Sequence, residues 1–103
     1  MPIVVPKNRA PTTPGEIIQD EFLVPLGMSQ AELARAMGVP TNRISQLISG
    51  KRALTAETAL RLEAVLGIDA GTWMNLQAAC DIFEANKVKP ARGLHRLKSL
   101  KTA

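Results

Sequence analysis

The sequence predicts an all-α protein, a bundle of five helices. Aromatic residues are scarce, with one Trp, two Phe and no Tyr among 103 residues. The core must therefore consist of Leu, Ile, Val, Ala and Met, which suit helices better than sheets. Apolar residues recur at helical spacing, and capping signals or glycines separate these runs. The chain is long enough for one domain with one core.

The first helix is predicted over residues 14–23. Thr13 can cap its N-terminus, and Glu16 closes a capping box three residues later. Pro25 has no backbone N–H and should end or kink the helix near residue 23. Gly27 is then the expected point of reversal.

The second and third helices are short. A second capping box, Ser29 with Glu32, begins the second helix, and Gly38 ends it because only Gly adopts a left-handed conformation at low cost. The third helix begins at Pro40 or Thr41. The residues predicted to face inward from these two helices are Leu33, Ala34, Met37, Ile44, Leu47 and Ile48.

Glycines should end the third and fourth helices, at Gly50 and Gly67. Thr55 is the expected cap of the fourth helix, and either Asp69 or Thr72 caps the fifth. The predicted buried stripe of the fourth helix is Ala59, Leu62, Val65 and Leu66. One apolar face of the fifth helix carries Trp73, Leu76, Cys80 and Phe83, which we assign either to the core or to a dimer interface.

Prolines near the N-terminus and charge near the C-terminus divide the chain into three parts. We predict an extended N-terminal arm over 1–12, a helical domain over 13–86 and a basic tail over 87–103. The tail holds six cations and no acid, which leaves a net charge of −2 for residues 1–86, since the whole chain carries +4. The basic pI therefore says little about nucleic acid. The tail is either a short basic amphipathic helix or disordered until a partner binds.

Residues 29–52 have the pattern of a helix-turn-helix. Ala34 is small where a large side chain would hold the two helices apart, and Gly38 lies in the turn. This geometry leaves one face of the motif's second helix, which is the third helix of the chain, free to enter the major groove of DNA. A surface helix can carry polar residues merely for solubility, but the combined spacing favours DNA binding.

The free face of the third helix carries amides, hydroxyls and a cation. Asn and Gln amides can pair bidentately with adenine in the major groove, and Arg43 can fork onto guanine or hold a phosphate. No carboxylate lies between Glu32 and Glu57, so this patch does not repel a duplex. The predicted base-reading residues are Thr41, Asn42, Arg43 and Gln46. The predicted DNA-backbone contacts are Gln30, Ser45, Ser49, Lys51 and Arg52.

Residues 29–66 resemble the helix-turn-helix of the λ-repressor/Cro-like (XRE) regulators. The residue types that match are Gln30, Ala34, Gly38, Ile44, Leu47, Gly50 and Lys51. The resemblance implies a λ-repressor-like domain in which Thr41, Asn42 and Gln46 read bases. It also implies that Gln30 and Ser49 help to fix the DNA backbone.

Two flanking stretches, "TPGEII…EFLVPLGMS" and "WMNLQAACDIFE", resemble the HigA antitoxins, so that the likeness covers about residues 13–85. Cys80 stands where that group usually has an aromatic or aliphatic residue, and Met74 replaces Leu. The resemblance implies a homodimer that represses its own operon from double-stranded operator DNA. It also implies a HigB-like ribonuclease toxin as partner. A two-fold pair would place its recognition helices about 34–36 Å apart.

The sequence indicates no enzyme, cofactor or metal site. His95 is the only histidine and lies in the tail, and Cys80 lies on an apolar face. Gly15, Gly27 and Gly38 are expected to punctuate helices and do not form a phosphate loop. The lone cysteine allows no intramolecular disulfide, and no stretch approaches a signal peptide or a membrane span. We therefore expect a cytoplasmic protein.

Two alternative functions are also compatible with the sequence. The first is a solitary XRE-type regulator without a toxin. The second is a protein whose main role is to inhibit a partner protein, through the tail 87–103 or a face of the first helix. Binding of RNA or an anionic membrane by the tail rests only on its charge and three leucines.

Overall fold

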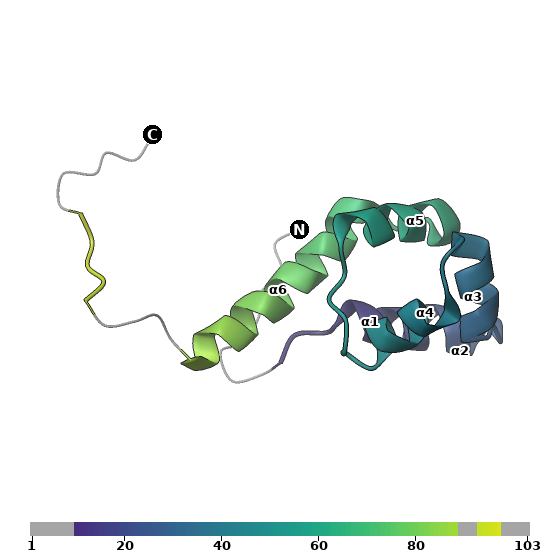
Figure 1. Cartoon of the computed structure of the whole chain (residues 1–103), viewed down its shortest axis with the longest axis horizontal. Coiled ribbons are helices and arrows are strands. Elements are labelled where there is room, and N and C mark those ends of the chain that lie inside the picture. The colour runs from purple at the N-terminus through teal and green to yellow at the C-terminus, as the bar shows by residue number, and fades with distance from the viewer. Residues whose placement is uncertain (1–9, 89–92, 98–103) are drawn as a thin grey trace.

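A computed structural model describes residues 10–88 and 93–97. Throughout these residues the regular structure is helical, and the helical runs form the predicted five-helix architecture (Figure 1). The first run comprises α1 (Pro14–Ile17), η1 (Ile18–Leu23) and α2 (Val24–Leu26). The others are α3 (Gln30–Met37), α4 (Thr41–Ile48), α5 (Ala56–Leu66) and α6 (Ala70–Val88).

Both predicted capping boxes are confirmed. The backbone N–H of Glu16 donates to Oγ1 of Thr13 over 3.0 Å, and the Thr13 N–H donates back to Oε1 of Glu16 over 3.1 Å. Ser29 and Glu32 exchange the same two bonds, each 3.0 Å long. These bonds satisfy N–H groups that the first turn of a helix leaves without partners.

The predicted end of the first helix at residue 23 is wrong, because the helical run continues through Leu26. It does so through η1, a π-helical stretch in which N–H groups bond five residues back, as Val24 N–H does to the Gln19 carbonyl. The wider turn accommodates Pro25, which lacks an N–H and would clash with a normal helical turn. Gly27 then ends the run with φ +61°, as expected.

Gly15 has a structural role that differs from the predicted punctuation. It is buried inside α1 against α4, and a Cβ built on it would lie 2.2 Å from the Leu47 carbonyl oxygen and 2.7 Å from Cα of Ile48. No real side chain fits at those separations. The absence of a side chain at Gly15 is therefore what lets the first helix approach the backbone of α4.

One hydrophobic core joins all five helical runs. α3 packs against α4 and α5, α1 packs against α4 and α6, and α5 packs against α6. Trp73 is completely buried, and its ring lies 6.4 Å from that of Phe22. The inward faces predicted for α3 and α4 are confirmed, with Ile48 only partly buried. The buried core residues are Ile18, Leu23, Leu33, Ala34, Met37, Ile44, Leu47, Leu54, Ala59, Leu62 and Trp73.

Helix α6 projects from the bundle in its second half (Figure 1). Asp69 caps it, since its carboxylate accepts from the N–H of Thr72 over 3.0 Å. The helix runs to Val88, so Lys87 and Val88, the first two residues of the predicted tail, are helical. Residues 93–97 of the tail contain no helix. Predictions about residues 1–9, 89–92 and 98–103 fall outside the described residues.

Candidate nucleic-acid interface

The turn between α3 and α4 is built as the sequence predicts. Gly38 has φ +71°, and the N–H of Val39 donates to the Ala34 carbonyl over 3.0 Å. Ala34 is only 1% exposed, and α3 packs against α4. The α3–turn–α4 unit is thus a helix-turn-helix, and α4 is the helix whose outer face stays open.

The outer face of α4 carries most of the predicted base-reading residues. Ile44 and Leu47 are buried, which fixes the rotation of the helix. The helical period then directs Asn42 and Gln46 away from the core. The exposed positions of this helix and its C-cap are Thr41, Asn42, Ser45 and Ser49, and Gln46 is half-exposed. The amide groups therefore lie where a ligand can reach them.

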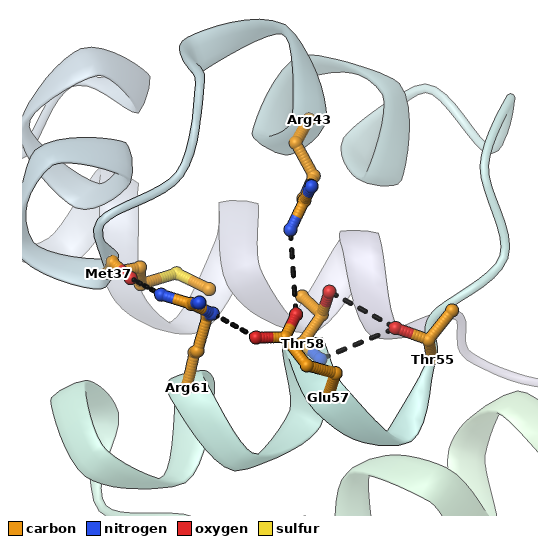
Figure 2. Close-up of polar contacts among 6 residues, drawn as sticks. All are labelled: Met37, Arg43, Thr55, Glu57, Thr58 and Arg61. Carbon is orange, nitrogen blue, oxygen red and sulfur yellow. Dashed lines mark hydrogen bonds and ion pairs between the residues drawn. The ribbon is translucent and has the colours of Figure 1, made fainter.

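Arg43 does not lie with these residues. Its side chain points from α4 toward α5, where Nη1 lies 3.6 Å from Oε1 of Glu57 (Figure 2). Glu57 also pairs with Arg61, which donates from Nη1 to the Met37 carbonyl over 2.8 Å. Glu57 lies 14 residues after Arg43 in the sequence, but folding places its carboxylate beside the Arg43 guanidinium. Residues 33–56 contain no carboxylate, as the sequence shows, but the fold brings Glu57 of α5 to Arg43.

The turn after α4 folds back on the helix. Gly50 has φ +79°, and the N–H groups of Lys51 and Arg52 both donate to the Gln46 carbonyl, over 2.9 and 3.2 Å. The Arg52 side chain donates from Nε to Oε1 of Gln46 over 2.9 Å. Lys51 and Arg52 are exposed. Sequence reasoning placed both cations near phosphates but missed the bond between Arg52 and Gln46.

Gln30 begins α3 and is half-exposed. It lies in the first turn, where N–H groups without helical partners and the helix dipole favour an anion. The position is compatible with the phosphate contact predicted for it, and that contact stays a prediction.

The apolar face of α6 divides between core and surface. Trp73 is buried and Leu76 packs against the core, whereas Phe83 is half-exposed under the ammonium group of Lys87, 5.0 Å from the ring centroid. Sγ of Cys80 lies 3.7 Å from the Thr12 carbonyl oxygen. Partial burial, followed by the charges of Asp81, Glu16 and Glu84, raises the pKa of the Cys80 thiol. A raised pKa is the opposite of what a nucleophilic cysteine needs.

Gln77 on α6 has a role that sequence reasoning missed. Its Oε1 accepts from the Leu54 N–H over 2.8 Å, and its Nε2 donates to Oδ1 of Asp81 over 2.9 Å. Leu54 lies in the segment that follows the turn after α4. Gln77 therefore ties α6 to the chain that leaves the candidate interface.

Neither a metal site nor a membrane span is present in the part of the chain that the structure describes. Its His, Cys, Asp and Glu side chains form no group of three or more that suits a metal ion. Its helices are too short or too polar to span a bilayer.

Comparison with known proteins agrees with this geometry. A helix-turn-helix family model matches residues 21–73. Antitoxin HigA-1 of Vibrio cholerae is 42% identical over 91 residues, which cover 81% of this chain and 86% of that protein. This chain belongs to the XRE-type helix-turn-helix family that includes the HigA antitoxins.

This chain is also similar to a second regulator and to a solved antitoxin structure. The uncharacterized HTH-type transcriptional regulator YbaQ of Escherichia coli K12 is 41% identical over 94 residues, covering 90% of this chain and 83% of YbaQ. The structure of Pseudomonas aeruginosa antitoxin HigA with the higBA promoter has a TM-score of 0.72 and 36% identity. It covers 76% of this chain and 85% of that one. The named relatives are regulators and antitoxins.

Proposed function

We propose that this XRE-family protein is a cytoplasmic, sequence-specific DNA-binding repressor and the antitoxin of a HigB–HigA-type pair. In this role it represses its own operon and neutralises a ribonuclease toxin. The observation that carries the proposal is the open amide-bearing face of α4, flanked by the exposed cations that follow the helix. The Pseudomonas HigA structure with promoter DNA supports it. Binding, without catalysis, is the proposed activity.

Base reading is assigned to the outward residues of α4. Asn42 and Gln46 each present an amide that can contact a base edge, and Thr41 can contact either a base or a thymine methyl group. Arg43 is a conditional member of the set, because it must leave Glu57 before it can reach DNA. Contacts to the DNA backbone are assigned to Gln30, Ser45, Ser49, Lys51 and Arg52.

Two copies would bind one operator. One recognition helix covers only a few base pairs, and a two-fold dimer doubles the site by placing its helices one turn of DNA apart, about 34–36 Å. We expect an operator with two half-sites at that spacing.

A gel-shift titration of the full chain tests DNA binding. The probes are the DNA upstream of its own gene and a random duplex of the same length, at two salt concentrations. We expect tight binding to the upstream DNA that resists random competitor. Binding to the random duplex should be weak and should fall steeply with salt. Equal affinity for both duplexes would contradict sequence-specific repression.

The antitoxin role needs a separate test. The full chain is co-expressed with the HigB-type ribonuclease encoded beside its gene, and growth and co-purification are measured. We expect the chain to restore growth and to elute with the toxin. The absence of such a gene, or growth arrest despite the co-expressed chain, would leave a regulator without a toxin.

A further inference from the structure

The backbone carbonyl oxygen of Gln46 accepts the hydrogen bonds that hold the turn after α4. It accepts from the N–H groups of Lys51 and Arg52, and the Ser49 hydroxyl also donates to it over 3.2 Å. The positive φ of Gly50 is what reverses the chain so that these groups can reach one carbonyl. The turn therefore holds the backbone of Arg52 beside Gln46 independently of its side chain.

The side chain of Arg52 then meets that of Gln46. Its Nε donates to Oε1 of Gln46 over 2.9 Å. A guanidinium group can only donate hydrogen bonds, and an amide nitrogen cannot accept one. The oxygen of the Gln46 amide must therefore face Arg52, and a half-turn of the amide would bring its NH2 group against the guanidinium.

The bond has a consequence for recognition. A free glutamine amide can exchange its donor and acceptor ends and so satisfy more than one base edge. Resting on the proposed DNA-binding function, we propose that Arg52 is a positioning residue that fixes the orientation of the Gln46 amide. It directs the Nε2 protons of Gln46 to a base acceptor. Arg52 thereby sets the base preference at the position that Gln46 contacts.

Lys51 provides a matched comparison. It is the neighbour of Arg52, it is also exposed, and its N–H bonds to the same carbonyl. In the described residues its side chain makes no hydrogen bond to Gln46. Each cation, as a phosphate contact, should contribute equally to affinity for every duplex, and removing either should reduce the salt slope by about 0.9. Only Arg52 should affect the choice of base.

The test uses the full chain and four variants, Arg52→Ala, Lys51→Ala, Gln46→Ala and the double variant of Gln46 and Arg52. An operator duplex is first selected by the wild type from a randomised pool. Affinities are then measured for all its single-base variants and for a random duplex. We expect wild type and Lys51→Ala to discriminate by about tenfold at the Gln46 position. Arg52→Ala should discriminate there by no more than about twofold.

Each outcome decides the proposal. Arg52→Ala should weaken the same position as Gln46→Ala, and the double variant should lose no further discrimination. Full base preference in Arg52→Ala, or a loss at a position that Gln46→Ala leaves intact, would overturn the positioning role. Retained binding of Arg52→Ala to the random duplex shows that the fold is intact. Failure of the wild type to select any sequence would instead refute the proposed function.

Discussion

Nη1 of Arg43 lies 3.6 Å from Oε1 of Glu57, so the arginine of the recognition helix is turned toward α5. The Arg43 side chain is 30% exposed, and the carboxylate that holds it is itself held by Arg61. Figure 2 shows the resulting chain of contacts from the end of α3 through α5 to α4. A phosphate must compete with Glu57 for Arg43.

Replacing Glu57 by Gln should therefore strengthen binding to DNA of any sequence. The change frees Arg43 and removes a negative charge beside the duplex. We expect a several-fold higher affinity for random duplex and a salt slope steeper by about 0.9, the value of one further phosphate contact. Salt titrations by fluorescence anisotropy measure both quantities.

Glu84→Gln is the matched control for this prediction. Glu84 pairs with Lys87 over 2.9 Å on α6 and is similarly exposed, but in the described residues it forms no ion pair with a residue of α4. It should leave the salt slope unchanged. If Glu57 acts through Arg43, Glu57→Gln should not alter the slope in an Arg43→Ala background. A steeper slope in that background would mean that the charge of Glu57 acts directly on DNA.

Asn42→Ala should reduce specific binding by about 1–3 kcal/mol and relax base preference at one position, because the amide is exposed on the outer face of α4. Affinity for random duplex should stay the same, since no charge is lost. Competition gel shifts with single-base variants of the operator provide the measurement. An equal loss on both kinds of duplex would remove Asn42 from the base-reading set.

Gly15→Ala should destabilise the fold by about 1–3 kcal/mol. The new Cβ meets the backbone of α4, which cannot rotate out of the way as a side chain can. Gly71→Ala in α6 is the control, because a Cβ there meets only Oδ2 of Asp69 at 3.8 Å. That change should be neutral or stabilising, since Ala is the better helix former. Urea unfolding of both variants decides the comparison.

Acid should weaken the capping box of α3. Hydrogen bonds from the backbone N–H and then the side chain of Ser29 hold the pKa of Glu32 below its usual value. A carboxyl with a lowered folded-state pKa contributes stability above its unfolded pKa, and this is lost as pH falls through the folded value. Glu32→Gln cannot titrate. Its free energy of unfolding should therefore approach that of the wild type as pH falls.

Urea unfolding at pH 7 and at about pH 3 measures this effect. Asp69 should contribute to acid sensitivity in both proteins, since hydrogen bonds with Thr72 lower its pKa too. The difference between wild type and Glu32→Gln is therefore the informative quantity. A difference that stays constant with pH would show that Glu32 does not stabilise the helix through its charge.

The sequence by itself determined the elements whose causes are local. A capping box needs only two side chains three residues apart, so Ser29 and Glu32 predict the start of α3. A left-handed glycine needs only its own freedom of φ, so Gly38 predicts the end of that helix. The rotation of α4 followed from the spacing of Ile44 and Leu47. The end of the first helix could not be predicted from the sequence, because accommodation of Pro25 depends on the π-helical turn that precedes it.

Only the tertiary structure decided the contacts between groups far apart in the chain or separated by a turn. Glu57 comes to Arg43 because α5 packs beside α4, and Gly15 touches α4 because two helices cross there. Periodicity tells which face of a helix is buried, but not which neighbour lies against it or where a long side chain ends. For that physical reason the open face of α4 was predictable, whereas the partners that orient Arg43 and Gln46 were not.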